Sequence, residues 1–144
     1  MSRPGLPEPQ FDAQNAPYFD GARRGELLLP KCTTCGQLSV PPVSNCTNCF
    51  GTDMEWMPAS GNGTVFSYIE YHRAWIPQFA PYLPYNVSII ELDEGPRLIS
   101  NVVSGETPVQ VGQRVRAVFE DRGSWKVPVF EVAEPGWAST TGHL

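Results

Sequence analysis

The second half of the chain is built from short hydrophobic runs in which apolar and polar positions alternate. The runs are rich in Val, Ile, Tyr and Phe, they are separated by glycine or proline, and they have no helical period of useful length. Two of the segments between these runs contain a glycine that follows charged residues, Gly95 and Gly123. A tight hairpin turn favours glycine at such a position. The pattern predicts five strands, at residues 64–72, 85–92, 97–103, 114–120 and 127–132.

Before this β region, apolar residues recur at roughly helical spacing until Gly25 ends the run. Pro17 leaves two alternatives, a helix that starts from a cap at Asp12 or a shorter helix that begins nearer Pro17 itself. Residues 1–10 contain three prolines and one glycine without an apolar period, which is typical of a mobile arm. The helical positions are Phe11, Ala16, Phe19 and Ala22.

All four cysteines fall within a short segment, as two Cys-x-x-Cys pairs separated by ten residues. Each pair lets two thiolates and the nearby backbone amides converge on one tetrahedral ion. Gly36 and Gly51 lie just past the pairs and permit the chain to fold back around the metal. We therefore predict one structural zinc ion with the ligands Cys32, Cys35, Cys46 and Cys49.

Two other uses of the thiols stay open. A redox-active Cys-x-x-Cys normally comes singly on a βαβ unit, which the sequence pattern does not contain. An iron site of rubredoxin type uses the same four thiolates. A closed four-thiolate shell leaves no position for water or substrate, so either metal is expected to be structural.

The pattern divides the chain into four segments. Residues 1–25 form the N-terminal arm and helix, 26–58 the ribbon, 59–133 a barrel, and 134–144 a flexible tail. The ribbon is too short to make a core alone, and five strands that close into a barrel expose no sheet edge. The predicted fold is mainly β: an N-terminal helix, a rubredoxin-like zinc ribbon, and a five-stranded barrel of the oligonucleotide/oligosaccharide-binding type, the OB-fold.

The net charge of the chain makes some classes of binding partner less favourable than others. The 144 residues carry a formal charge of -5, whereas neutralising a phosphate backbone calls for a surplus of basic side chains. Nucleic acid is therefore an unfavoured principal partner. The sequence has neither a membrane-spanning apolar run nor the apolar core of a secretion signal, so we expect a soluble, cytoplasmic protein in which thiols stay reduced.

Candidates for a catalytic base are scarce. His143 is expected to be a solvated tail residue, while His72 is either a binding or acid–base group at the barrel mouth or an ordinary strand-end histidine. The carboxylates around Glu94 flank a hairpin, and the glycines around Gly61 form a turn, not a phosphate-binding loop. We expect no independent catalytic site.

A proline-stiffened apolar stretch, residues 75–85, lies between the first two predicted strands and is longer than a hairpin requires. If it is exposed, it offers an aromatic patch to another protein or to the acyl chain of a ligand. If it folds over the end of the barrel, it is a lid-like part of the core.

Several segments follow one another in an order that is more specific than any of them by itself. They are Gly25 to Leu29, Cys32 to Gly36, Pro41-Pro42, Cys46 to Cys49, Ser60 to Val65, and residues 91–98, 111–115 and 127–130. In this order, over about residues 11–132, the chain resembles the family of small zinc-ribbon plus OB-fold proteins that are associated with acyl-CoA. Phe50 departs from the pattern, since many relatives have a glycine directly after the last cysteine.

The resemblance implies a non-catalytic accessory subunit in a hetero-oligomer. Members of the family accompany thiolases, lipid-transfer-protein-type aldolases and related condensing enzymes, whose own residues do the chemistry while the small protein stabilises them and helps to form the acyl-CoA channel. The acyl group stays open among steroid-derived, aromatic and short-chain types. Arg73 and Lys31 either meet CoA phosphates or are ordinary solvated cations. The candidate ligand-facing or partner-facing residues are Tyr71, His72, Arg73, Trp75, Phe79 and Tyr82.

The sequence is also compatible with two rival functions. OB barrels with aromatic faces bind single-stranded nucleic acids by base stacking, although the acidic balance opposes that use here. A stand-alone protein that binds acyl-CoA or hydrolyses its thioester is the second rival, and turnover by the isolated chain would favour it.

Overall fold

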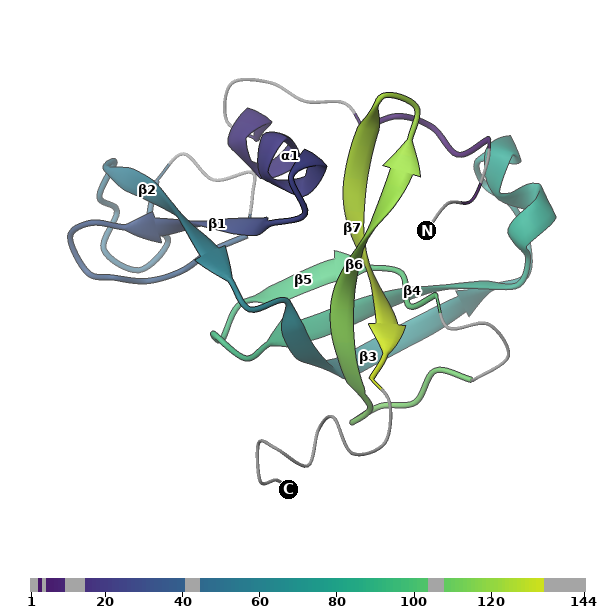
Figure 1. Ribbon diagram of the computed structural model, residues 1–144. Coiled ribbons are helices and arrows are strands. Elements are labelled where there is room, and N and C mark those ends of the chain that lie inside the picture. Colours follow the sequence, from purple (N-terminus) through teal and green to yellow (C-terminus); the bar gives the residue numbers. More distant parts are fainter. Residues whose placement is uncertain (1–2, 4, 10–14, 41–44, 104–107, 134–144) are drawn as a thin grey trace.

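The computed structural model of the chain describes residues 3, 5–9, 15–40, 45–103 and 108–133. The cap predicted at Asp12, the Pro41-Pro42 pair, and the predicted tail at 134–144 with His143 lie outside these residues. In the described part, a short helix precedes a two-stranded sheet and a curled five-stranded sheet (Figure 1). The predicted mainly β fold with an N-terminal helix is confirmed.

The elements follow the predicted order, with two local differences. The helix has Pro17 in its first turn, where proline has no hydrogen bond to lose, so the shorter of the two predicted helices forms. The strand β2 is an addition to the five predicted strands, and it contains Pro58, which is tolerated because each strand of a two-stranded sheet has a free edge. The elements are α1 (Ala16–Arg23), β1 (Leu27–Cys32), β2 (Met54–Ala59), β3 (Asn62–Tyr71), the 3₁₀ helix η1 (Pro77–Tyr82), β4 (Tyr85–Leu92), β5 (Arg97–Ser100), β6 (Arg114–Arg122) and β7 (Trp125–Val132).

The five-stranded sheet has the order β5-β4-β3-β6-β7, and all neighbouring strands are antiparallel. The central strand β3 pairs with β6 only over Asn62 to Thr64 and with β4 from Gly63 to Tyr71. A β-bulge between Val65 and Ser67 shifts the β3–β4 register and increases the local twist, which lets the sheet curl. The hairpin between β6 and β7 turns at Gly123, whose φ of 65° suits glycine.

The two edges of the curled sheet meet at one point. Val102 and Phe130 form a parallel bridge, the Val103 N–H donates to the Phe130 carbonyl at 2.7 Å, and the Phe130 N–H donates to the Asn101 carbonyl at 2.9 Å. Strand β5 ends at Ser100, before the predicted end at residue 103, because the chain leaves β4 there to reach β7. The five strands thus make a half-barrel whose two edges approach each other at this bridge.

One hydrophobic core joins the helix, the ribbon and the half-barrel. Tyr18 of α1 and Leu29 of β1 belong to the same buried cluster as Val65, Ile90 and Phe130 of the five-stranded sheet. The ribbon therefore does not need a core of its own, because its first strand covers one end of the barrel core.

The side chain of Asn86 fixes the segment after β5 to strand β4. Its Oδ1 accepts from the Val102 N–H at 2.8 Å, and its Nδ2 donates to the Val102 carbonyl at 2.7 Å. We expect Asn86→Asp to lower the free energy of unfolding by about 2–3 kcal/mol, because a carboxylate oxygen would then face a carbonyl oxygen. Urea denaturation measures this loss. Gln78→Glu makes the same amide-to-acid change at an exposed position of η1, and an equal loss in that control would contradict the role of Asn86.

Candidate functional site

The four cysteines come together at the end of the two-stranded sheet. Strand β1 ends at Cys32, opposite Met54 of β2, and the Thr33 N–H donates to the Asp53 carbonyl at 3.0 Å. The four sulfur atoms lie within 4.8 Å of one another. Cys32 and Cys46 are buried, whereas the other two thiols reach the surface.

Each of the two Cys-x-x-Cys segments forms the same kind of backbone turn. The Gly36 N–H donates to the Cys32 carbonyl at 2.8 Å, and the Phe50 N–H donates to the Cys46 carbonyl at 2.9 Å. The residue directly after each pair has a positive φ, 82° at Gly36 and 64° at Phe50. This repeated geometry brings the two pairs face to face, and its positive φ is a conformation that glycine adopts without steric cost.

The electrostatics of the cluster favour a bound cation. The Asn48 side-chain amide and the Gln37 backbone lower the pKa of Cys35 to about 6, so this thiol is ready to become a thiolate. The pKa of Cys49 rises to about 12, because the favourable Gly51 N–H is outweighed by the Cys32 sulfur, by burial and by the other thiols. Four thiolates this close repel one another, and a divalent ion removes that repulsion.

The donor set therefore fits a structural zinc ion. Four sulfur ligands in two Cys-x-x-Cys turns are the usual tetrahedral zinc site of ribbon domains, and they leave no coordination position for a substrate. The Asn48 amide at 3.6 Å from the Cys35 Sγ, and the Asn48 N–H at 3.4 Å from the Cys46 Sγ, supply the hydrogen bonds that orient thiolate ligands.

Phe50 has a φ of 64°, in the left-handed region, which is a strained conformation for a residue other than glycine. It is 76% exposed, so its replacement removes little buried surface. We expect Phe50→Gly to raise the free energy of unfolding of the zinc-loaded chain by up to about 1 kcal/mol, because relief of the left-handed strain exceeds the entropy cost of glycine. Thermal unfolding measures the change, and Thr47→Gly, at an exposed position inside the same turn, is the control. A stabilisation equal in both variants would contradict the strain at Phe50.

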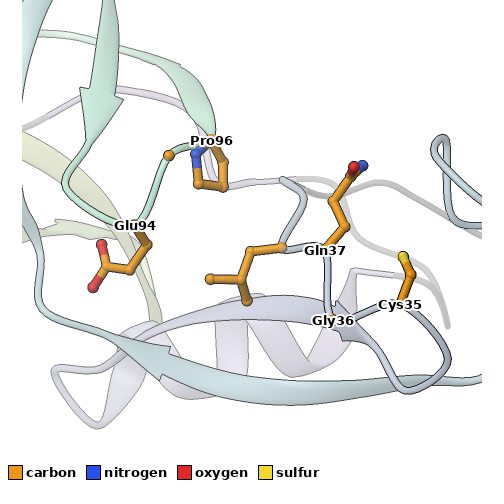
Figure 2. A pocket seen from close by; sticks show the side chains of 7 residues that line it. Cys35, Gly36, Gln37, Glu94 and Pro96 are labelled. Atoms are coloured by element: carbon orange, nitrogen blue, oxygen red, sulfur yellow. The ribbon is translucent and has the colours of Figure 1, made fainter.

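A groove of about 470 Å³ lies where the first cysteine turn faces the β4–β5 turn. Figure 2 shows Cys35, Gly36 and Gln37 on one side of it and Glu94 and Pro96 on the other. Its lining residues include one acidic group and no basic side chain, so the groove offers no positive charge to the phosphates of a CoA nucleotide.

We call residues 72–84, between β3 and β4, the aromatic loop. The six candidate contact residues lie in this loop or directly before it, and they form two groups. The Phe79 ring stacks on the Tyr85 ring with centroids 4.6 Å apart, and the Tyr71 ring lies tilted to the Tyr85 ring at 5.3 Å. Tyr82 lies on the same side, since the Arg3 guanidinium contacts both the Phe79 and Tyr82 rings. These three aromatic residues form an inner cluster that is part of the packed fold.

The other three candidates form an outer group. Trp75 is 66% exposed, and the Arg73 guanidinium lies over its ring at 4.7 Å. The His72 Nε2 lies 3.0 Å from the exposed Glu70 carboxylate. The aromatic loop therefore has a packed part and an exposed part: Phe79 of η1 is buried against Tyr85, and the segment before η1 presents a tryptophan to the surface.

Sequence reasoning missed one residue of this region. Arg3 was assigned to a mobile arm, but in the structure its side chain packs against the inner aromatic cluster and against Glu120. The sequence offered no signal for this contact, because its two partners lie more than seventy residues away along the chain.

Nothing in the described residues forms a catalytic set around His72, which is exposed and contacts a carboxylate on its own strand. None of the helices in the described part of the chain is long and apolar enough to cross a membrane.

Comparisons with known proteins agree with this architecture. Residues 19–55 match the family model described as "ChsH2, rubredoxin-like zinc ribbon domain", and residues 56–120 match "ChsH2, C-terminal OB-fold domain". A solved structure, the "Ltp2-ChsH2(DUF35) aldolase", is similar with a TM-score of 0.78 and 33% sequence identity, over 88% of this chain and 100% of that chain.

Two curated relatives are subunits of larger enzymes. The probable enoyl-CoA hydratase alpha subunit of Thermomonospora curvata is 35% identical over 132 residues, which cover 90% of this chain and 40% of that protein. The benzoylsuccinyl-CoA thiolase subunit BbsA of Thauera aromatica is 32% identical over 99 residues, 69% of this chain and 60% of the relative. The chain thus spans less than two thirds of the length of these relatives. With both family models matched in the order of its two sheets, the chain belongs to the ChsH2 family of proteins that join a rubredoxin-like zinc ribbon to an OB-fold domain.

Proposed function

We propose that the chain is a non-catalytic accessory subunit of a thiolase-like or aldolase enzyme that acts on acyl-CoA thioesters. The observation that carries the proposal is the similarity to the ChsH2(DUF35) chain of an aldolase, which this chain covers over its full length. The thiolase subunit among the relatives supports the same class of partner. Carbon–carbon bond chemistry takes place in the large partner, in agreement with the exposed position of His72, whose side chain contacts the Glu70 carboxylate.

The zinc ribbon provides rigidity in this proposal. Cys32, Cys35, Cys46 and Cys49 hold one zinc ion, and the ion fixes the end of the β1–β2 sheet. Because β1 also contributes to the common core, a rigid ribbon keeps the docking surface of the whole chain in one shape. The metal itself stays outside the reaction.

The outer group of the aromatic loop is the proposed contact with the partner or with the acyl-CoA entrance. An exposed tryptophan beside an arginine combines a large apolar surface with a cation, and both residue types are enriched at the energetic centres of protein interfaces. The inner cluster of Tyr71, Phe79 and Tyr82 packs against Tyr85 and Arg3, and so holds the rest of the loop in place.

The proposal is tested by isolating the tagged chain from its native cell and identifying the large subunit that accompanies it. We expect a thiolase-like polypeptide in a defined stoichiometry, and acyl-CoA turnover by the complex but not by the isolated chain. Turnover by the isolated chain would overturn the accessory role. Steeply salt-dependent binding to single-stranded oligonucleotides would instead support a nucleic-acid module.

The contact surface is tested separately with the reconstituted complex. We expect Trp75→Ala to weaken the partner's affinity by about 30-fold, which corresponds to about 2 kcal/mol, because the change removes a large apolar side chain from an interface centre. Calorimetric titration of the partner measures this change. Val111→Ala truncates an equally exposed apolar side chain outside the aromatic loop and should leave the affinity unchanged. If both variants bind as the unaltered chain does, the contact lies elsewhere.

A further inference from the structure

Glu120 is a fully buried carboxylate at one end of the half-barrel. It lies on β6 and has an exposed fraction of 0%. Taking a carboxylate out of water is costly unless cations and hydrogen bonds replace the lost hydration. The Arg122 Nε supplies one such contact, at 2.9 Å from the Glu120 Oε1.

The second cation comes from the opposite end of the sequence. The Arg3 Nε donates to the Glu120 Oε2, and the Arg3 Nη2 donates to the Oε1 at 3.1 Å, so the guanidinium binds the carboxylate with two parallel hydrogen bonds. The same Nη2 also donates to the Asn101 Oδ1 at 3.2 Å. Two parallel donors matched to two carboxylate oxygens are specific to a planar guanidinium, since an ammonium group is a point charge.

Two aromatic rings complete the surroundings of Arg3. Its guanidinium carbon lies 5.9 Å from the centre of the Phe79 ring and 5.7 Å from the centre of the Tyr82 ring, both in η1. Rings at this distance attract a cation through their quadrupoles. The Arg3 side chain is 14% exposed, so the cation is largely withdrawn from water.

The rest of the N-terminal arm, defined as residue 3 and residues 5–9, follows the β6–β7 hairpin. Leu6 is buried, and the Pro7 carbonyl accepts from the Arg122 Nη1 at 3.3 Å. The Glu8 carboxylate accepts from the Ser124 N–H at 3.4 Å. Figure 1 shows the arm, in purple, crossing from the tip of this hairpin towards η1.

We propose that Glu120, Asn101, Phe79 and Tyr82 form a guanidinium-binding site, and that this site is occupied by the chain's own Arg3, which fastens the N-terminal arm and η1 to the end of the barrel. The site explains why a carboxylate is fully buried on β6, since two guanidinium groups share its two oxygens. It also makes the order of η1 depend on Arg3, which lies more than seventy residues away in sequence. The inference concerns the isolated chain and does not rest on the proposed accessory function.

The first test uses the zinc-loaded full chain with Arg3→Ala and Arg3→Lys. We expect Arg3→Ala to lower Tm by about 5–10 °C, because a buried carboxylate loses one of its two cations. Arg3→Lys keeps the charge without the planar fork, so it should recover less than half of the loss. Arg24→Ala removes an exposed arginine that is paired with Glu26 and should change Tm by no more than about 2 °C.

Hydrogen exchange of the same variants tests the link to η1. We expect Arg3→Ala to accelerate exchange of the Phe79 and Leu83 amides, whose hydrogen bonds to Ile76 and Ala80 form the two ends of η1, by at least about tenfold, while the β1–β2 amides stay unchanged. Unaltered exchange of η1 in Arg3→Ala would overturn the proposal.

Chemical rescue tests the identity of the ligand. About 10 mM methylguanidinium should raise the Tm of Arg3→Ala, whereas methylammonium at equal ionic strength should not, and neither should raise the Tm of the unaltered chain or of Arg24→Ala. Equal responses of Arg3→Ala to both cations, or of all three proteins to methylguanidinium, would show a general salt effect and overturn the guanidinium site.

Discussion

Substitution of Cys46 by serine is expected to remove the zinc ion and to unfold the ribbon. Cys46 is fully buried, its sulfur lies 3.5 Å from the Cys35 sulfur, and its carbonyl and N–H both hold the second cysteine turn. Structural zinc contributes an apparent binding free energy of about 10–16 kcal/mol in small domains at neutral pH, which exceeds the stability of most folded chains of this size. A serine oxygen is a much poorer zinc ligand than a thiolate.

The effect should extend beyond the ribbon. Leu27 and Leu29 of β1 belong to the common core, so a disordered ribbon exposes one end of the barrel core to water. We expect elemental analysis to find about one zinc ion per unaltered chain and much less in Cys46→Ser, together with a lower and broader thermal transition.

The control for this experiment is Thr52→Ser, which introduces serine at an exposed position close to the same turn. It should retain the metal and the unaltered Tm. A Cys46→Ser chain that kept its metal and melted like Thr52→Ser would contradict the assignment of the four-cysteine site.

Truncation of Phe130 to alanine has the second largest expected effect. Phe130 is fully buried near the end of β7, within the core cluster that joins the helix, the ribbon and the sheet. Its backbone also forms the bridge that brings the two edges of the sheet together. Removal of a buried phenyl ring leaves a cavity, and such changes cost about 3–5 kcal/mol.

Urea denaturation should show this loss as a reduced midpoint at nearly constant slope. Ile99→Ala is the matched control, because Ile99 lies on β5 in the same sheet but is 70% exposed. We expect that control to change the unfolding free energy by about 0.5 kcal/mol or less. If Phe130→Ala cost no more than Ile99→Ala, the closure of the half-barrel would not depend on this ring.

The position of Arg3 has a consequence for the proposed contact surface. The inner aromatic cluster contacts Arg3 of the N-terminal arm, and its residues lie in the same loop as the exposed Trp75 or at the border of that loop. A partner that displaces the arm would therefore act on the same loop that it is proposed to contact. Binding measurements with Arg3→Ala separate the two roles, since that variant leaves the outer group of residues intact.

The local pattern determined most of the elements. Five strands, the short helix that begins near Pro17 and the hairpin turns follow from period-two alternation, proline placement and glycine, because these preferences act over a few residues. The candidate metal site was equally readable, since the spacing of two Cys-x-x-Cys pairs already brings four sulfurs near one point.

Tertiary structure decided what depends on distant partners. The strand β2 forms because it pairs with β1, the early end of β5 follows from the bridge to β7 after it, and Arg3 is ordered because a carboxylate on β6 needs a cation. None of these contacts leaves a periodic trace, because each joins residues that are far apart in the chain and is stabilised by burial. The sequence by itself therefore determined the elements, the cysteine cluster and the family resemblance, whereas folding alone decided how the sheet closes and what fastens the aromatic loop to it.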